Sequence, residues 1–450
     1  MRAIIAATKG RNIPTRKQTM EIISQEFIKP VSPTPNHLKS YDYSTLDQFS
    51  PSSYIPILLY YTSPQLGEDN QKPNAINSAR LKQLKKSLSQ VLAHYYPLAG
   101  RLGKNNTSVD CNDEGVPFIE AFVHNQRLED ILMSNPHEKT LTKSFLPLTF
   151  ESFSSNVLLL VQVTFFECGG MVIGISATHK IFDASSVFTF LTDWSALARQ
   201  DNPNFVLTQL VPIATLVPLS TEVGHVPDAE AVISREPCRT NIYVFNSSGI
   251  ANLKIKGSSE NIPIPSRVEV VTSILWKCLT ANSKRPSLLT HTVNLRKRVD
   301  PPMHAHHIGN FGWLLLASKH ESEEDIASMV VSIRKGLFEL DNNYVKRLKG
   351  DKAVETIRDG ISLLISGIKD VDFYRFTSWC GYTVYDVDFG WGKPILFGTI
   401  EPKVKNTTIL LDTKDGGVEA WVTLSEEDMK MFEKNKELLN YATLKASHPT

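Results

Sequence analysis

A nearly continuous apolar stretch at residues 157–178 constrains the fold of this chain most strongly. Its two parts, VLLLVQVTFF at 157–166 and MVIGISAT at 171–178, are rich in residues that favour strands and are separated by Gly169-Gly170. This pattern predicts a β-hairpin, because glycine suits the reversal between two paired strands. Strands that are apolar at almost every position are buried on both faces, so we expect the hairpin inside a sheet.

Helical and strand patterns recur along the whole chain and do not separate into blocks, which favours a mixed α/β fold. A helix starting near Ser78 and ending before Pro97 carries an apolar stripe made of Leu81, Leu84, Leu88, Val91 and Tyr95. Further helices are expected over 267–279, after a Ser322–Asp325 capping box, and as the last helix from Ser425 and Asp428 through Phe432. A second hairpin is expected where TILLD and VEAWVTL flank TKDGG.

Composition excludes several classes of protein. The 450 residues are 42% hydrophobic and 21% charged, which is typical of globular proteins and not of disordered or coiled-coil chains. The sequence contains no run of about 18 uncharged apolar residues, so no membrane-spanning helix is expected. Lys and Arg number 48 against 47 for Asp and Glu, and a net charge of +1 gives no general field for nucleic acid. We expect neither a membrane nor a nucleic acid as partner.

The five cysteines lie far apart and form no CxxC pair, which indicates neither a disulfide framework nor a zinc ribbon. A reducing compartment fits this pattern, and we expect a cytoplasmic protein. Residues 1–19 carry five basic and no acidic side chains, and we interpret them as an extension before an alternative start at Met20. An organelle-targeting segment is the alternative.

Five prolines between residues 200 and 237, without any sustained period, predict a long extended linker. We interpret this segment, 200–237, as the crossover between an N-terminal domain at 20–199 and a C-terminal domain at 238–450. Both parts have α/β patterns.

His179 is the first candidate for chemistry, because it follows an apolar strand and precedes a helix that starts after Asp183. A strand-to-helix junction exposes side chains from a rigid base, and imidazole, with an ordinary pKa of about 6.5, suits proton abstraction at neutral pH. The functional interpretation is a general base. The alternative is a histidine hydrogen-bonded at a sheet edge, with Asp183 as the N-cap of the helix.

Two motifs carry a family resemblance. Residues 179–183, HKIFD, match HxxxD, and residues 388–392 read DFGWG about 200 positions later. Matching stretches lie in order at 95–101 (YYPLAGR), 272–277 (TSILWK), 294–302 (NLRKRVDPP) and 309–310 (GN). With these motifs the chain resembles the plant BAHD family of acyl-CoA-dependent acyltransferases. Its HKIFDASS and SWC segments are most similar to the alkaloid acetyltransferases of that family.

The resemblance implies two domains of the chloramphenicol acetyltransferase type, joined by a long crossover, with a channel between them for CoA and acceptor. It assigns His179 as the general base that activates an alcohol for direct attack on a thioester in a ternary complex. It implies acetyl-CoA as cosubstrate, and neither a permanent cofactor nor a metal. The sequence contains no GxSxG elbow or HExxH run that would indicate a hydrolase.

By the same resemblance, the indole N–H of Trp379 is a candidate donor to the oxyanion, with an ordinary packed tryptophan as the alternative. Thr377 is a candidate contact to the acceptor. Asp183 is implied to turn away from the acyl centre and pair with Arg296, which makes both structural. The DFGWG residues Asp388, Gly390, Trp391 and Gly392 are implied to be architectural, since two glycines suit a tight turn.

The implied CoA contacts are Arg267, Ser273 and Lys277, for which a charged helix face in solvent is the alternative. His304, His306 and His307 depart from the family pattern. A metal site there is one interpretation, but no carboxylate or cysteine completes a set locally, and a loop beside the channel is the simpler one.

Together these inferences predict a monomeric enzyme that transfers acetyl from acetyl-CoA to a hydroxyl of a plant specialised metabolite, with an alkaloid as the expected acceptor. Other donors (hydroxycinnamoyl, benzoyl or malonyl) and amine, phenolic or terpenoid acceptors remain open. A non-catalytic binding protein on the same scaffold, or a thioester hydrolase, are the alternatives from other classes.

Overall fold

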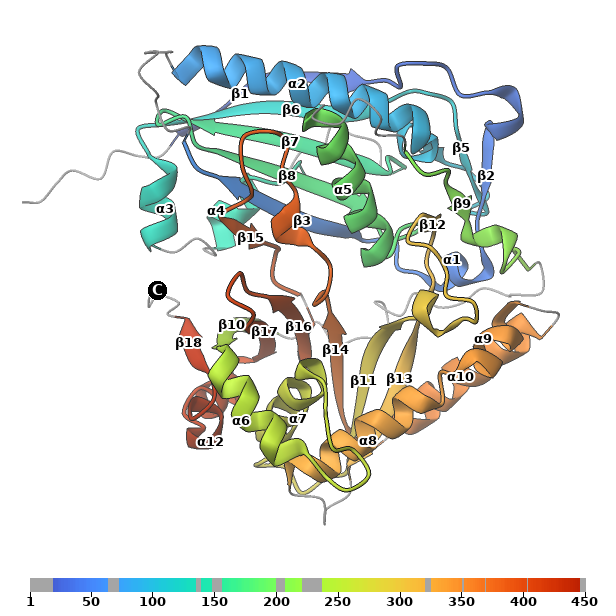
Figure 1. Cartoon of the computed structure of the whole chain (residues 1–450), viewed down its shortest axis with the longest axis vertical. Helices are drawn as coiled ribbons and strands as arrows, with labels where there is room; N and C mark the ends of the chain where they lie inside the picture. Colours follow the sequence, from blue (N-terminus) through green and yellow to red (C-terminus); the bar gives the residue numbers. More distant parts are fainter. Residues whose placement is uncertain are drawn as a thin grey trace, which may run out of the picture.

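The computed structural model describes residues 19–63, 73–134, 139–147, 156–199, 207–220, 237–319, 325–349, 352–368, 370–402 and 404–445. The described chain forms two sheet-rich domains, one above the other in the view of Figure 1. The first is built on a six-stranded sheet and the second on a seven-stranded sheet. The expected mixed α/β fold is therefore confirmed. The extension expected at 1–19 lies outside the described residues, except for its last residue, which begins strand β1.

The first sheet has the strand order β1-β6-β7-β8-β3-β15. Its strands are β1 (Thr19–Ile28), β3 (Tyr54–Tyr61), β6 (Val116–His124), β7 (Leu159–Phe166), β8 (Met171–Thr178) and β15 (Leu396–Gly398). β7 and β8 pair antiparallel, and every residue of both is buried. The buried hairpin that the sequence predicts is therefore confirmed, and it occupies the middle of the sheet.

Helices cover both faces of the first sheet. α2 (Pro73–His94) and α5 (Ala184–Arg199) lie on one face, and α3 (Leu128–Ser134) and α4 (Lys139–Ser144) lie on the other (Figure 1). The predicted stripe of α2 is confirmed, because most of its residues are fully buried against α5 and the sheet. α2 stops two residues before the Tyr96–Ala99 turn that contains Pro97.

The second sheet has the order β13-β11-β14-β16-β17-β10-β18. Its strands are β10 (Cys238–Phe245), β11 (Ser287–Asn294), β13 (Gly312–Lys319), β14 (Asp372–Ser378), β16 (Thr407–Asp412), β17 (Val418–Ser425) and β18 (Thr443–Lys445). Its helices are α6 (Ser247–Gly257), α7 (Arg267–Leu279), α8 (Ile326–Phe338), α9 (Asn342–Lys349), α10 (Ala353–Gly367), α11 (Glu426–Phe432) and α12 (Lys436–Leu439). The predicted β16–β17 hairpin and the predicted helix α7 are confirmed.

The second sheet has two different faces. One packs against α6, α7 and α8 in a core of its own, through residues such as Leu410 and Val422. On the other face, Ile409, Leu411 and Trp421 belong to the same apolar cluster as the helices of the first domain. The two domains therefore share one hydrophobic interface.

Two predicted helix starts differ in detail from the structure. Asp325 is itself the N-cap of α8, because its carboxylate accepts from the Ser328 N–H at 2.6 Å, so it is not the third residue of a box that begins at Ser322. Ser322 lies outside the described residues. Ser425 caps α11 as predicted, but α11 is not the last helix, since the one-turn helix α12 follows it.

The boundary predicted at residue 238 is not a clean division of the two sheets. β15 follows it in sequence and yet pairs antiparallel with β3 at the edge of the first sheet. Only residues 207–220 of the predicted linker, together with Pro237, are described, and they contain β9 (Val211–Pro212) and a 3-10 turn at Ile213–Thr215. β9 pairs in parallel with β12 (His307–Ile308), so this part of the linker is anchored to the second domain.

The remaining elements are small. α1 (Thr45–Phe49) precedes β3, and β2 (Ser40–Asp42), β4 (Arg101–Leu102) and β5 (Ser108–Asp110) form a separate three-stranded sheet. Short 3-10 turns occur at Asn36–Leu38, Arg296–Arg298 and Val384–Asp386. None of the helices that the structure describes is long and apolar enough to cross a membrane. All five cysteines are free thiols.

One buried histidine of the second domain is expected to make the stability of the fold depend on pH. His291 of β11 is 5% exposed, and its Nδ1 lies 3.1 Å from the Thr292 carbonyl oxygen. Burial lowers the pKa of His291 to about 4. Because the unfolded chain binds this proton near pH 6.5, the stability that the neutral ring contributes is present above pH 6.5 and is lost as the pH falls to about 4, by up to about 3 kcal/mol.

We therefore predict that the free energy of unfolding in urea falls steeply between pH 6.5 and 4.5, and that His291→Gln flattens this dependence. His124→Gln, at an exposed surface histidine, is the control. An unchanged pH dependence in the His291 variant would contradict the assignment of this acid sensitivity to His291.

Candidate active site

His179 lies directly after β8, in the turn that leads to α5. Its backbone N–H donates to the Ser53 carbonyl oxygen at 2.8 Å, and its own carbonyl accepts from the Asn310 side chain at 3.0 Å. Both sides of the residue are thus fixed by distant parts of the chain. The ring is half-buried, and its Nδ1 is buried with no hydrogen-bond partner among the described residues. Nε2 is not among the buried unpartnered atoms and is therefore the ring nitrogen that is left accessible.

Asp183 is both the N-cap of α5 and the partner of Arg296, the two roles considered from the sequence. Its Oδ1 accepts from the Ser186 N–H at 2.9 Å, which caps the first turn of α5, and its Oδ2 accepts from Arg296 at 2.6 Å. The Phe311 N–H adds a third contact at 3.1 Å. Burial acts to raise the pKa of Asp183, but the Arg296 guanidinium and these donors outweigh it, and the net pKa is lowered. The carboxylate is held ionised.

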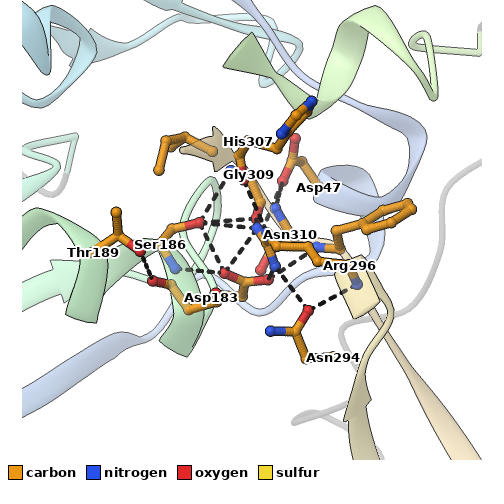
Figure 2. A network of polar contacts seen from close by, with 12 residues as sticks. Asp47, Asp183, Ser186, Thr189, Asn294, Arg296, His307, Gly309 and Asn310 are labelled. Carbon is orange, nitrogen blue, oxygen red and sulfur yellow. Dashed lines mark hydrogen bonds and ion pairs between the residues drawn. The ribbon is translucent and has the colours of Figure 1, made fainter. Parts of the chain in front are cut away.

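Arg296 comes from the second domain and is only 2% exposed. Besides Asp183, its guanidinium donates to the carbonyl oxygens of His307, at 3.0 Å, and Gly309, at 2.8 Å. It also donates to the Asn294 side chain at 3.3 Å and to the Ser186 hydroxyl at 3.2 Å. Figure 2 shows these contacts converging from both domains on the start of α5. A planar fork with five N–H groups can satisfy such a set, which a lysine cannot.

A second clamp on the His179 segment comes from Asn310. Its side-chain amide lies within hydrogen-bond distance of the carbonyl oxygens of His179 and Lys180, at 3.0 and 3.1 Å, and of Asp47 Oδ1 at 2.7 Å. Asp47 is buried, and burial raises its pKa despite the donors from Ser44 and Asn310. Sequence reasoning did not identify Asp47, although the Ser44–Asp47 spacing is a capping-box signature.

Trp379 lies one residue beyond the end of β14 and is 9% exposed. Its ring meets Phe188 of α5 and Phe397 of β15 edge to face, at centroid distances of 5.7 and 6.1 Å. Among the described residues its indole N–H has no hydrogen-bond acceptor, so the group is free to donate to a ligand. The Trp379 ring is therefore packed, while its indole N–H is left without an acceptor among the described residues.

Thr377 is half-buried on β14 and lies beside Ile409 of β16. Ile409 belongs to the cluster shared with the first domain, so the Thr377 side of the strand faces that domain. This placement is compatible with the expected contact between Thr377 and an acceptor.

The DFGWG segment forms a tight turn against the first domain. The Asp388 carboxylate accepts from the N–H groups of Gly390 and Gly392, at 2.8 and 3.0 Å, and both glycines have positive φ angles, 108° and 102°. Phe389 is fully buried and stacks on Trp391 at 5.5 Å. These contacts fix the shape of the turn, which agrees with an architectural role.

Partners within α2, α5 and β3 hold the same turn in place. The Gln83 amide donates to the Phe389 carbonyl oxygen at 2.7 Å, Arg199 donates to that of Asp388 at 2.8 Å, and the Tyr61 hydroxyl donates to that of Val387 at 2.8 Å. A segment of the C-terminal half is thereby fastened to the first domain.

The three candidate CoA contacts are not equivalent in the structure. Arg267 forms an ion pair with Asp412 at 2.8 Å, and Lys277 donates to Glu437 at 2.7 Å. Both cations are partly exposed. Ser273 is fully buried, with its hydroxyl unpartnered, and therefore offers no surface to CoA. The expected contact of Ser273 with CoA is wrong, because this side of α7 faces the core.

The histidine cluster is engaged in hydrogen bonds. His306 Nε2 lies 2.9 Å from the Asp193 carboxylate, and His306 Nδ1 lies 2.9 Å from His304 Nδ1. His307 Nδ1 lies 3.0 Å from the His304 carbonyl oxygen. Within the described residues, no group of three or more His, Cys, Asp or Glu side chains is placed to hold a metal ion.

Removing the Arg296 guanidinium leaves the Asp183 carboxylate without its cation. We predict that Arg296→Met lowers the free energy of unfolding by about 3 to 5 kcal/mol. Arg296→Lys should have an intermediate effect, because it retains the charge without the fork. Urea unfolding of both variants measures this, with the exposed Arg285→Met as control. Stability equal to that of the parent in Arg296→Met would show that the pair contributes little.

Removing the Asn310 amide should loosen the His179 segment. For Asn310→Ala we predict that backbone amides of residues 179–183 exchange with solvent about 10- to 100-fold faster, since each lost buried hydrogen bond leaves an unsatisfied acceptor. Hydrogen exchange read by mass spectrometry measures this. Asn343→Ala, at an exposed asparagine, is the control. Unchanged protection at 179–183 would exclude Asn310 as a clamp.

Comparison with known proteins places this geometry in a family. The model of the Transferase family matches residues 18–439. Among curated proteins, the epi-neemfruitin B 7-O-acetyltransferase of Melia azedarach is 36% identical, with 95% of this chain and 99% of the relative covered. A 17,18-epoxy-17-hydroxycur-19-ene N-malonyltransferase of Strychnos nux-vomica is 35% identical, with 94% and 91% covered.

Vinorine synthase of Rauvolfia serpentina is 35% identical over 430 residues, with 92% of this chain and 96% of the relative covered. The crystal structure of vinorine synthase superimposes with a TM-score of 0.78 at 34% identity and covers 94% of this chain and 98% of that chain. The match of family model, relatives and fold extends over nearly the whole chain. The chain therefore belongs to the Transferase family, the BAHD acyltransferases, and is an acyl-CoA-dependent acyltransferase.

Proposed function

We propose that this enzyme transfers an acetyl group from acetyl-CoA to a hydroxyl of a plant specialised metabolite, with His179 as the general base. The observation that carries the proposal is the setting of His179, whose backbone is fixed on both sides while Nε2 remains open. A base is effective when its nitrogen is held within hydrogen-bond reach of the proton that it takes. The family membership supports the reaction class.

In the proposed reaction both substrates bind before chemistry occurs. His179 Nε2 takes the proton of the acceptor hydroxyl as its oxygen attacks the thioester carbonyl carbon. The tetrahedral intermediate collapses with cleavage of the carbon–sulfur bond, and the CoA thiolate recovers the proton from the imidazolium. No acyl-enzyme forms. Holding the reactants together in one site supplies much of the rate enhancement.

Other residues have supporting roles in this proposal. The Trp379 indole N–H donates to the oxyanion, where loss of one donor typically reduces the rate about 10²- to 10³-fold. Thr377 contacts the acceptor from the neighbouring strand. Arg267 and Lys277 meet the CoA phosphates by exchanging their carboxylate partners. Asp183 and Arg296 keep the His179 segment in place.

The acceptor that we propose is an alkaloid alcohol, as the HKIFDASS and SWC segments indicate. A second candidate is a limonoid-type terpenoid alcohol, because a limonoid 7-O-acetyltransferase of Citrus sinensis is 35% identical to this chain. A malonyl donor with an amine acceptor is a further candidate, since the N-malonyltransferase is 35% identical. We propose a cytoplasmic monomer, which agrees with five unpaired cysteines.

The test is incubation of the purified protein with isotopically labelled acetyl-CoA and a pooled alkaloid and terpenoid extract, followed by mass spectrometry. We predict a label-shifted product, formed about 10² to 10⁴ times more slowly by His179→Ala. His37→Ala, outside the candidate site, is the matched control.

A labelled product that forms equally fast with His179→Ala would exclude the general base. Labelled acetate alone would indicate a hydrolase. Absence of every label shift, also with malonyl-CoA, would favour a binding protein.

A further inference from the structure

Tyr382 is a residue that neither the motifs nor the proposed reaction explain, although it lies between the two parts of the site. It follows Trp379 by three positions, and its N–H donates to the Trp379 carbonyl oxygen at 3.4 Å. The side chain is only partly exposed. Its ring and its hydroxyl make contacts in two different directions.

The ring of Tyr382 stacks on Phe188 of α5, with a centroid distance of 5.0 Å and an interplanar angle of 26°. Phe188 in turn meets Trp379 edge to face at 5.7 Å. Phe188 is 5% exposed, so it has little freedom to move away from either ring. Offset stacked and edge-to-face pairs of this kind each stabilise by about 0.5 to 1.5 kcal/mol. The orientation of the Trp379 indole thus depends on a stack that ends on Tyr382.

The hydroxyl of Tyr382 contacts the hydrogen-bond network that surrounds the Asp183–Arg296 pair at the start of α5. It accepts from the Asn294 side-chain amide at 3.3 Å. Asn294 Oδ1 accepts in turn from the Arg296 guanidinium at 3.3 Å. Burial and the nearby Asp183 carboxylate raise the pKa of Tyr382, so its hydroxyl stays protonated at neutral pH. A neutral hydroxyl accepts from the Asn294 amide and keeps its own proton available for donation.

We propose that Tyr382 is a positioning residue that couples Trp379 to the Asp183–Arg296 pair, and so holds the oxyanion donor and the general base in one geometry. The inference rests on the proposed function, because it assumes the roles of Trp379 and His179. It adds a residue between the SWC and DFGWG motifs to those that support the proposed reaction. Tyr382 touches neither substrate in this scheme and acts through Phe188 and Asn294.

The experiment compares Tyr382→Phe, which removes only the hydroxyl, with Tyr382→Leu, which also removes the stack. We expect kcat for acetyl transfer to fall about 5- to 10-fold in the first variant and about 10²- to 10³-fold in the second, with KM for both substrates within about twofold. Tyr374→Phe is the matched control, since Tyr374 lies on the preceding strand β14 and its buried hydroxyl donates to the Leu279 carbonyl oxygen. Its kcat should stay within about twofold of the parent.

A double-mutant cycle tests the route of the effect. If Tyr382 acts through Asn294, then Tyr382→Phe should reduce kcat less than about twofold further in an Asn294→Ala background. An unchanged kcat in Tyr382→Phe, fully multiplicative effects in the cycle, or an equal fall in Tyr374→Phe would overturn the proposal.

Hydrogen exchange tests the coupling through Tyr382 separately from the proposed acyl transfer. In Tyr382→Phe we expect faster exchange both at residues 183–187 and at 379–382, because one hydroxyl supports both segments. This readout needs no substrate. If the parent transfers no acyl group but both segments loosen together, the proposed reaction fails and the coupling holds. If only one segment changes, or neither, the coupling is wrong whatever the activity.

Discussion

The ion pair between Asp183 and Arg296 is the interaction on which the arrangement of the site depends. It joins the first turn of α5 in the first domain to the segment after β11 in the second. Since Arg296 is 2% exposed and Asp183 also caps α5, removing Arg296 would leave the Asp183 carboxylate without its cation, and removing Asp183 would also uncap the helix. The geometry of His179, four residues upstream, is therefore set by both halves of the chain.

The two domains are interleaved at more places than this pair. β15 leaves the second domain to extend the first sheet, Trp379 packs on Phe188 and Phe397, and the DFGWG turn is fastened to α2 and α5. Asn310 holds the His179 segment from the opposite side. A site built at such an interface is completed only when both domains fold. Substitutions that destabilise the interface should therefore also change the geometry of the site. Residues without chemistry of their own, such as Asn310, therefore contribute to the position of His179.

Local patterns predicted the elements well, because their signals are local. The apolar runs at β7 and β8, the stripe of α2 and the Ser425 cap are each readable within about ten residues. The family resemblance indicated His179, Asp183 and Arg296. Pairings between distant segments, such as β15 with β3 or Asp47 with Asn310, leave no mark in either segment alone. The expected contact of Ser273 with CoA failed for a related reason, since α7 is so apolar that the sequence did not show which side faces the core.

The most direct test of this account is a double-mutant cycle on kcat with Asp183→Asn and Arg296→Gln, two neutral variants of similar size, measured on folded protein with saturating acetyl-CoA and acceptor. If one interdomain pair positions the base, the double variant should be no slower than the slower single variant, because the second change removes an interaction that is already lost. If the two effects on kcat multiply instead, the residues act independently, and the pair does not govern the geometry of His179.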